Sequence, residues 1–330
     1  CCLRSWSVWF LEVSTMDIVQ PTGLRPLTWR TELAIILEAL VAIGSVPMLP
    51  MLLIYLFWKA CCSKPEERWQ RWRRFTAMLA VYLFLMFIPT SPRPWLMGSA
   101  FFRWWLEYFS VKLVYQDGQP LPPRQYIYLF MPHGLYPFSG ACASIASMRD
   151  IFPRMRIAAA SVSFRIPVIR QLIGWINTIP VDSGSIRKAL KAGDSVGLFP
   201  GGVAEMVRTD GNQEKLLLRS RKGFVRLAME HGVPIVPVYV FGQSVLWSQL
   251  PLPRIMERLS RWLQASIILP YGRFGLLVPQ KKSLLYAIGA PIQPGDNMNT
   301  THDAVITAVQ TLYDTYKGRY GWEKRILQID

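Results

Sequence analysis

The chain has 330 residues, of which 51% are hydrophobic and 13 are tryptophan, and its formal net charge at pH 7 is +16. This length suits one large α/β domain with an appendage, and the hydrophobic content is high for a freely soluble protein. The charge calls for an acidic partner, such as nucleic acid, an anionic membrane surface or a phosphate-bearing ligand. Its five cysteines form no CxxC pair and no Cys/His metal spacing, which suits a reducing compartment and a protein without bound metal.

The first predicted element is a hydrophobic segment that follows an N-terminal stretch, residues 1–32. Residues 33–58 carry Glu38 as their one charged side chain and are long enough for a transmembrane helix. However, Pro47 and Pro50 lie near the middle, and prolines break or kink a helix. We therefore favour a re-entrant hairpin that turns at residues 47–50, ahead of two complete spans or a buried helix pair.

A basic loop and a second apolar run come next. The cations of the loop are Lys59, Lys64, Arg68, Arg71, Arg73 and Arg74. The apolar run, residues 75–88, is short for a membrane span. Two full spans would also place the basic loop away from a cytosolic domain, against the positive-inside tendency. Residues 33–91 are thus predicted to form a membrane-embedded hairpin with a basic loop, which would suit a bilayer or the monolayer of a lipid droplet.

Residues 92–330 follow a proline-rich break and alternate short apolar runs with amphipathic stretches. Strands are predicted at 126–131, 156–160, 177–181, 195–199, 235–241 and 286–288. Helices are predicted at 140–149, 166–175, 185–191, 221–231, 253–264 and 304–319. Strands that alternate with helices predict an α/β domain in which helices cover a mostly parallel sheet.

Two glycine turns carry the candidate chemistry. The histidine turn, Pro132-His133-Gly134, ends one predicted strand, and the glycine turn, Pro200-Gly201-Gly202, ends another, with Glu205 close behind. Open α/β sheets display catalytic side chains at such strand ends. A neutral imidazole can take a hydroxyl proton, glycine N–H groups can stabilise an oxyanion, and a carboxylate can hold the imidazole tautomer. The absence of GxSxG, GxGxxG and P-loop motifs argues against a serine elbow and a nucleotide cofactor.

Several blocks together carry a family resemblance. They are the two glycine turns, with Glu205, and residues 221–229, 236–243 and 289–292. In order and spacing they resemble the type-2 diacylglycerol acyltransferase family over residues 89–322. The resemblance implies a glycerolipid acyltransferase-like enzyme of the endoplasmic reticulum membrane and lipid droplet, with its catalytic domain facing the cytosol. It would transfer an acyl group from acyl-CoA, a co-substrate and not a cofactor, to diacylglycerol, with His133 and Glu205 as catalytic residues.

The chain departs from related patterns at four positions. Met131 stands where the family often has His or Glu, and Phe138 replaces an Asp of the glycerol-phosphate acyltransferases, so the residue that orients His133 is expected elsewhere, at Glu205. Ser183 and residues 203–204 replace arginines of phosphate-accepting relatives. Without those cations a neutral alcohol is the favoured acceptor.

A basic block, residues 219–226 with the cations Arg219, Arg221, Lys222 and Arg226, supplies the predicted acyl-CoA contacts. Substrate binding is assigned to Pro132, Gly134, Pro200, Gly201 and Gly202 at the turns, and to Arg221, Lys222, Gly223 and Phe224 in this block. Contact between its cations and the CoA phosphates is one interpretation, and a solvated or headgroup-facing stripe is the other.

Other functions stay open at this stage. The same chemistry on monoacylglycerol or a long-chain fatty alcohol would need only a different pocket shape. A non-catalytic lipid-binding protein of the lipid droplet is a second alternative. Nucleic-acid binding is disfavoured, because apolar runs accompany the interleaved Trp and Arg residues, which favours a membrane surface. A homo-oligomer is also left open.

Overall fold

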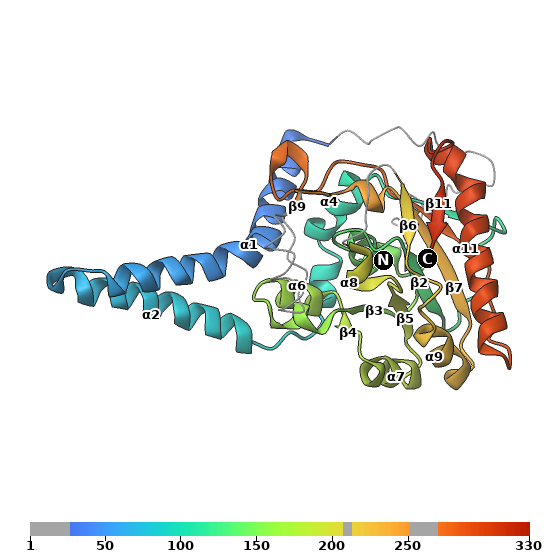
Figure 1. The fold of residues 1–330 in the computed structure, drawn as a ribbon, viewed down its shortest axis with the longest axis horizontal. Coiled ribbons are helices and arrows are strands. Elements are labelled where there is room, and N and C mark those ends of the chain that lie inside the picture. Colours follow the sequence, from blue (N-terminus) through green and yellow to red (C-terminus); the bar gives the residue numbers. More distant parts are fainter. Residues whose placement is uncertain (1–26, 207–212, 251–269) are drawn as a thin grey trace, which may run out of the picture.

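The computed structural model describes residues 27–206, 213–250 and 270–330, and its centre is a seven-stranded sheet (Figure 1). The strand order is β1-β10-β7-β2-β5-β3-β4. The strands are β1 (Lys112–Tyr115), β2 (Ile127–Met131), β3 (Met155–Ala159), β4 (Ile179–Pro180), β5 (Ser195–Leu198), β7 (Ile235–Phe241) and β10 (Leu285–Ile288). Five neighbours, from β7 to β4, are parallel, and β10 pairs antiparallel with β7. The predicted α/β class with a mostly parallel sheet is confirmed, and all six predicted strands lie in it.

Helices cover both faces of this sheet. The larger ones after the hairpin are α4 (Ala100–Tyr108), α7 (Ser183–Lys191), α9 (Gly223–His231) and α11 (Met298–Tyr320). Strand β2 shows why both faces are apolar: Leu129 and Met131 belong to the core under α7, α9 and α11, whereas Tyr128 and Phe130 belong to the core on the α4 side. A strand buried on both faces reads as a continuous hydrophobic run, which made β2 predictable.

Some predicted helices differ in detail. The helix expected at 140–149 is two short pieces, α5 (Phe138–Ala143) and a 3-10 turn, Ala146–Met148. The helix expected at 166–175 begins later, as α6 (Ile169–Trp175). The helix expected at 253–264 and most of the N-terminal segment, residues 1–26, lie outside the described residues.

Two small sheets lie beside the main one, and neither was predicted. Strand β6 (Glu214–Leu216) pairs in parallel with β11 (Leu327–Ile329), near the end of the chain. Strand β8 (Ser248–Gln249) pairs antiparallel with β9 (Pro270–Tyr271). The first of these sheets matters for the site, because β6 leads into residues that contact Glu205.

The hydrophobic segment before the sheet forms a helical hairpin of α1 (Trp29–Cys61) and α2 (Pro65–Phe87). The predicted turn at residues 47–50 is wrong, because α1 stays helical through Pro47 and Pro50 and the chain reverses at residues 62–64. A proline removes a hydrogen bond and bends a helix without necessarily ending it. Figure 1 shows α1 running along the body and then projecting away from it beside α2. By length and composition, α1 could cross a membrane.

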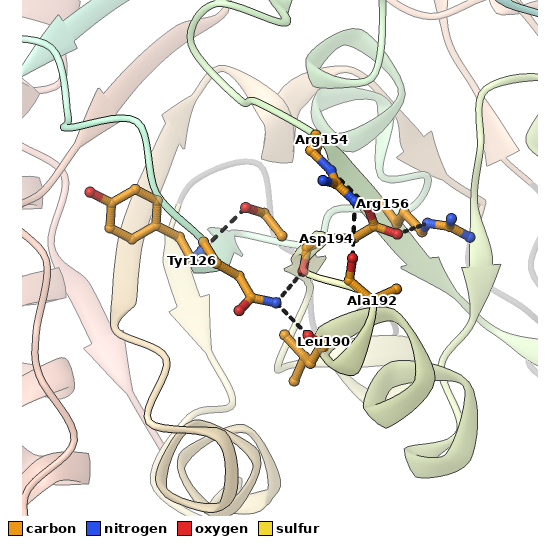
Figure 2. A network of polar contacts seen from close by, with 8 residues as sticks. Tyr126, Arg154, Arg156, Leu190, Ala192 and Asp194 are labelled. Carbon is orange, nitrogen blue, oxygen red and sulfur yellow. Dashed lines mark hydrogen bonds and ion pairs between the residues drawn. The ribbon is translucent and has the colours of Figure 1, made fainter.

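The amino-terminal edge of the parallel strands is held by polar contacts (Figure 2). The carboxylate of Asp194 forms ion pairs with Arg154 at 3.0 Å and Arg156 at 2.6 Å. The Tyr126 N–H donates to Ser195 Oγ at 3.1 Å, which joins the starts of β2 and β5. These contacts fix how the three strands β3, β5 and β2 begin, and thereby where they end.

Candidate active site

The candidate site lies where three parallel neighbours, β5, β2 and β7, end at the same edge of the sheet. The histidine turn follows β2, the glycine turn and the short helix α8 (Gly202–Met206) follow β5, and Gln243 follows β7. The two residues predicted to act in catalysis meet here: the N–H of His133 donates to Glu205 Oε1 at 2.6 Å. Carboxyl ends of parallel strands are where open α/β sheets bind ligands.

The ring of His133 is held by a neighbouring carbonyl. Its Nδ1 lies 2.7 Å from the oxygen of Gly134. Because a carbonyl only accepts hydrogen bonds, Nδ1 carries the proton and the lone pair of the neutral ring is on Nε2. Burial lowers the pKa of His133, and the Gly134 carbonyl opposes this shift in part. The imidazole is therefore neutral near pH 7, with Nε2 able to accept a proton.

Glu205 is buried, with 2% of its surface exposed, and it contacts main-chain groups. Besides the N–H of His133, its carboxylate accepts from the N–H of Leu217 at 3.4 Å. Burial raises the pKa of Glu205 to about 7, and the nearby Glu214 adds to the shift. Glu205 was predicted to orient the imidazole, but its carboxylate bonds the main-chain N–H of His133, and the ring bonds the Gly134 carbonyl instead.

The glycine turn makes room for this carboxylate. A Cβ at Gly201 would overlap the carboxyl group of Glu205, so a larger residue there would displace it. Gly202 has φ +55°, in the left-handed region that glycine adopts most readily. Gly201 is therefore needed for the position of Glu205, whereas Gly202 only eases the path of the backbone. Their predicted contribution to an oxyanion site stays a prediction.

Gln243 is a buried clamp on the histidine turn that sequence reasoning missed. Its Nε2 donates to the carbonyls of His133 at 3.1 Å and Tyr136 at 2.6 Å, and its Oε1 accepts from the N–H of Ser139 at 3.0 Å. Gly134, with φ +65°, lies so close that an added Cβ would be 2.9 Å from this amide. The one signal in the sequence is a polar residue directly after a glycine at the end of a wholly apolar strand.

A second buried carboxylate, Glu214, lies behind the site. It accepts hydrogen bonds from Tyr239 at 2.9 Å, Ser244 at 2.7 Å and Arg325 at 3.2 Å. Tyr239 of β7 is paired with Met131 of β2, and Met131 directly precedes the histidine turn. Burial raises the pKa of Glu214 as well. This cluster could not be predicted from the sequence, because its members come from three segments that are far apart in the chain.

The positions that depart from related patterns are filled by packing. Met131 is buried in the core shared with α9 and α11. Phe138 begins α5 and stacks on Trp247, with ring centroids 6.2 Å apart. Both side chains are thus occupied by hydrophobic contacts, which leaves the Gly134 carbonyl to orient the imidazole.

The basic block borders the site and presents its cations to solvent. Arg221 and Lys222 are exposed, and Lys222 Nζ donates to Asn299 Oδ1 at 2.7 Å. Gly223 begins α9 and Phe224 is buried in the core. The N–H of Arg221 donates to the carbonyl of Leu218, the residue after Leu217, whose N–H reaches Glu205. The block is therefore linked to Glu205 through the main chain.

None of the described ranges, 27–206, 213–250 and 270–330, contains a group of three or more side chains that could hold a metal ion.

The two prolines predicted to contact substrate lie at the ends of neighbouring strands. Pro132 is buried at the end of β2 and Pro200 is half-buried after β5. The groups that the structure brings together at this edge are the imidazole of His133, the carboxyl group of Glu205 and main-chain N–H groups.

Fold, site and relatives together define an α/β acyltransferase. The sequence profile described as "Diacylglycerol acyltransferase" matches residues 72–329, and the chain belongs to this family. It is 28% identical to Diacylglycerol O-acyltransferase 2 of Danio rerio over 255 residues, 69% of this chain and 70% of that protein. It is 26% identical to the Homo sapiens enzyme of that name over 265 residues, 72% of this chain and 68% of that protein.

Two further comparisons complete this picture. The chain is 26% identical to 2-acylglycerol O-acyltransferase 1 of Bos taurus over 254 residues, 69% of this chain and 75% of that protein. Among solved structures, the 1-acyl-sn-glycerophosphate acyltransferase PlsC of Thermotoga maritima aligns with a TM-score of 0.42 and 15% identity, over 86% of this chain and 97% of that one. A likeness this distant carries no argument about substrates.

Proposed function

We propose that the protein transfers an acyl group from acyl-CoA to the hydroxyl group of diacylglycerol, with His133 as the general base. The observation that carries the proposal is the hydrogen bond between His133 Nδ1 and the Gly134 carbonyl, 2.7 Å long. It leaves Nε2 of a neutral imidazole as the group that can accept the hydroxyl proton. Membership of the diacylglycerol acyltransferase family supports the substrate class.

The proposed reaction is a direct attack on the thioester. Nε2 takes the proton as the hydroxyl oxygen bonds to the thioester carbonyl, which forms a tetrahedral oxyanion. The main-chain N–H of Gly201 is the proposed donor to this oxyanion, since the N–H of Gly202 already donates to the carbonyl of Phe199 at 3.2 Å. The intermediate collapses as the C–S bond breaks, and the proton on the imidazolium passes to the CoA thiolate. The ester, neutral imidazole and free thiol balance the starting groups.

Glu205 is proposed to support the imidazolium in two ways. Its carboxyl group fixes the main chain of His133, and its negative charge, when ionised, favours a positive ring close by. With a pKa of about 7, the carboxyl group can hold or release a proton in the working pH range. This is a positioning and electrostatic role, since the ring itself is held by Gly134.

Acyl-CoA is the proposed acidic partner of the net charge of +16. The exposed cations Arg221, Lys222 and Arg226 lie in or next to the first turn of α9 and could contact the CoA phosphates. Ser183, at the start of α7, provides no cation for an acceptor phosphate, which supports a neutral alcohol. The 2-acylglycerol acyltransferase among the relatives makes monoacylglycerol the second candidate acceptor.

A membrane location follows from the same proposal. Both proposed lipids, diacylglycerol and triacylglycerol, reside in bilayers or droplets, and α1 is long and apolar enough to enter one. We place the enzyme at the endoplasmic reticulum membrane and the lipid droplet, with its catalytic domain facing the cytosol. A homo-oligomer remains compatible with this placement.

A reconstituted assay tests the proposal. The full chain in nanodiscs is given labelled oleoyl-CoA and, separately, diacylglycerol, monoacylglycerol and a long-chain alcohol. Triacylglycerol is the expected main product, and His133→Ala is expected to abolish it. His231→Ala is the matched control, because its Nδ1 also lies near a carbonyl, that of Leu227 at 3.1 Å, but at the end of α9. Undiminished activity of His133→Ala would contradict the mechanism, and a preference for another acceptor would change the substrate.

A further inference from the structure

The first half of α1 lies on the body and turns an uncharged face outward. Ile35, Ala39 and Ile43 are buried against the body. The opposite face exposes four apolar side chains at four-residue spacing, between 48% and 69% exposed: Trp29, Leu33, Leu37 and Val41. A helix that packs on a protein and faces water normally carries polar residues on its outer face, so this stripe needs an apolar partner.

The charged residues in the middle of α1 lie on the side of the helix that faces the body. Between Arg30 and Lys59 the sequence has two charged residues, Glu32 and Glu38, and both face the body. Glu32 pairs with Arg273 and lies 3.7 Å from Lys281. Glu38 accepts a hydrogen bond from Trp105 Nε1 at 2.9 Å. The outward face is thus free of charge for about 40 Å of helix at 1.5 Å per residue.

A loop beside the start of α1 extends the apolar surface. Phe274 and Leu276 are 66% and 45% exposed. The guanidinium of Arg273, which pairs with Glu32, lies 4.6 Å from the centroid of the Phe274 ring. Phe274 has φ +59°, a left-handed backbone that costs a non-glycine residue about 1–2 kcal/mol. Such strain together with an exposed ring suggests that the ring is displayed for a purpose.

We propose that this docking face, made of Trp29, Leu33, Leu37, Val41, Phe274 and Leu276, rests on the surface of a phospholipid bilayer. The first half of α1 then lies in the plane of the headgroups. Only the projecting part of the hairpin enters the hydrocarbon, since Figure 1 shows it turning away from the first half of α1. The proposal refines the membrane part of the proposed function and holds for any lipid acceptor.

The surroundings of the docking face favour lipid over a second copy of the chain. It continues into the projecting hairpin, where Met51, Ile54, Phe84 and Phe87 are all exposed. Aromatic rings and cations meet at its margin: Arg30 lies 5.4 Å from the Trp29 ring centroid. Indole rings and cations together suit the headgroup region, where the rings meet acyl chains and the cations meet phosphates.

This placement limits how deeply the helical hairpin enters the bilayer. The apolar part of α2 after its cations, residues 75–87, is 13 residues long and spans about 20 Å at 1.5 Å per residue, against about 30 Å for a hydrocarbon core. The projecting hairpin therefore reaches beyond one leaflet without matching a full span. With the docking face at headgroup level, the body lies at the depth where a lipid hydroxyl group meets water.

Site-specific fluorescence in the full chain tests the proposal. Cys1, Cys2, Cys61 and Cys62 are replaced by Ser, Cys142 stays because it is buried, and an environment-sensitive probe is attached to Phe274→Cys. Ile326→Cys is the matched control, since Ile326 is a 76% exposed apolar residue just before β11, a strand that lies across the body from α1 in Figure 1. In phosphatidylcholine nanodiscs, we expect lipids spin-labelled near the headgroup to quench the 274 probe at least threefold more than the 326 probe. Equal quenching by aqueous iodide at both sites would overturn the proposal.

A functional measurement separates lipid docking from dimerisation. Leu37→Asp with Phe274→Asp is expected to raise KM for diacylglycerol in vesicles about tenfold and leave turnover in detergent unchanged, whereas Ile326→Asp changes neither. Protection of the 274 probe from iodide without quenching by lipid would assign the face to a second copy and contradict the proposal. The fluorescence needs no turnover, so its failure is distinguishable from failure of the proposed reaction.

Discussion

Two polar clusters lie at opposite edges of the same strands and differ in how their carboxylates are held. At the amino-terminal edge, Asp194 is paired with Arg154 and Arg156 (Figure 2). At the carboxyl-terminal edge, Glu205 accepts from the main-chain N–H groups of His133 and Leu217, and burial raises its pKa to about 7. Ion pairs fix a charge in place, whereas a buried carboxyl group near its pKa can change charge during a reaction. We therefore expect substitutions at the first edge to change mainly stability and substitutions at the second edge to change mainly the proposed reaction.

The largest expected effect comes from crowding the carboxyl group at the second edge. Gly201→Ala should lower kcat by roughly 100-fold or more, because the new Cβ would displace Glu205 and, with it, the main chain of His133. Gly202→Ala is the matched control: its Cβ meets nothing within 4 Å, and its φ of +55° predicts only about 1–2 kcal/mol of strain. Equal activities of the two variants would show that the position of the Glu205 carboxyl group does not matter for acyl transfer. Acyl-transfer rates measured on folded protein decide between these outcomes.

The clamp on the histidine turn should give the next largest effect. Gln243→Met removes three hydrogen bonds, one to His133 in the histidine turn and two to the residues that follow it, and we expect kcat to fall about 10- to 100-fold with KM unchanged. Gln171→Met is the control, since Gln171 is also buried and bonds main-chain groups, Val168 N–H and the Leu85 carbonyl, but next to the hairpin. Both variants should lose about 1–3 kcal/mol of unfolding free energy. If kcat fell equally in both, the clamp would have no special role.

Glu205 should make stability depend on pH. Its pKa is about 7 in the folded protein against an ordinary 4.5, so the fold binds this proton more tightly than the unfolded chain does. The tighter binding of this proton stabilises the fold fully below about pH 4.5, and the stabilisation is lost as the pH rises to about 7. The free energy of unfolding should then decrease by an amount on the order of 3 kcal/mol. Glu205→Gln cannot ionise, and its unfolding free energy should vary less over this window. The free energy of unfolding is measured by chemical denaturation at several pH values. If it varied with pH in the same way for both proteins, the account would be wrong.

The smallest effect on activity is expected at the amino-terminal edge. Asp194→Asn breaks the ion pairs with Arg154 and Arg156 but keeps the side-chain volume. The unfolding free energy should fall by about 1–2 kcal/mol, because a buried carboxylate loses its charge although its arginine partners are partly exposed to solvent. Activity per folded molecule should stay within about twofold of the wild-type value, since the strands end in the same place. A large loss of kcat with normal stability would show that this edge takes part in the chemistry.

The sequence predicted the sheet well and the hairpin less well. Strands such as β2 and β7 are buried on both faces and read as continuous apolar runs. β1 was missed because all four of its residues are only half-buried and it lies at the edge of the sheet. The turn at residues 47–50 was wrong because the effect of a proline within a helix depends on its neighbours: here α1 continues and the chain reverses later.

The site was predicted in its residues and not in its contacts. Glu205 was proposed as the partner of His133 because it follows the second glycine turn, and the structure shows that the contact runs through the main-chain N–H of His133. The Gly134 carbonyl could not be foreseen, because main-chain groups have no sequence signature. Glu214 was missed because β6 is three residues long and is held by β11, more than 100 residues later. Long-range pairing of this kind leaves no local pattern.

The central claim, that His133 Nε2 is the base, is tested most directly by the pH profile of kcat/KM for acyl transfer to diacylglycerol. Wild-type protein and His133→Ala are compared from about pH 5 to 8, the range in which an imidazole titrates. Because burial lowers the pKa of His133, protonation of its ring should lower the wild-type kcat/KM only at a pH below the usual imidazole value. A separate step near pH 7 would come from ionisation of Glu205 and should be absent from Glu205→Gln. His133→Ala should lack measurable transfer throughout. A His133→Ala profile that coincides with the wild-type profile would contradict the account.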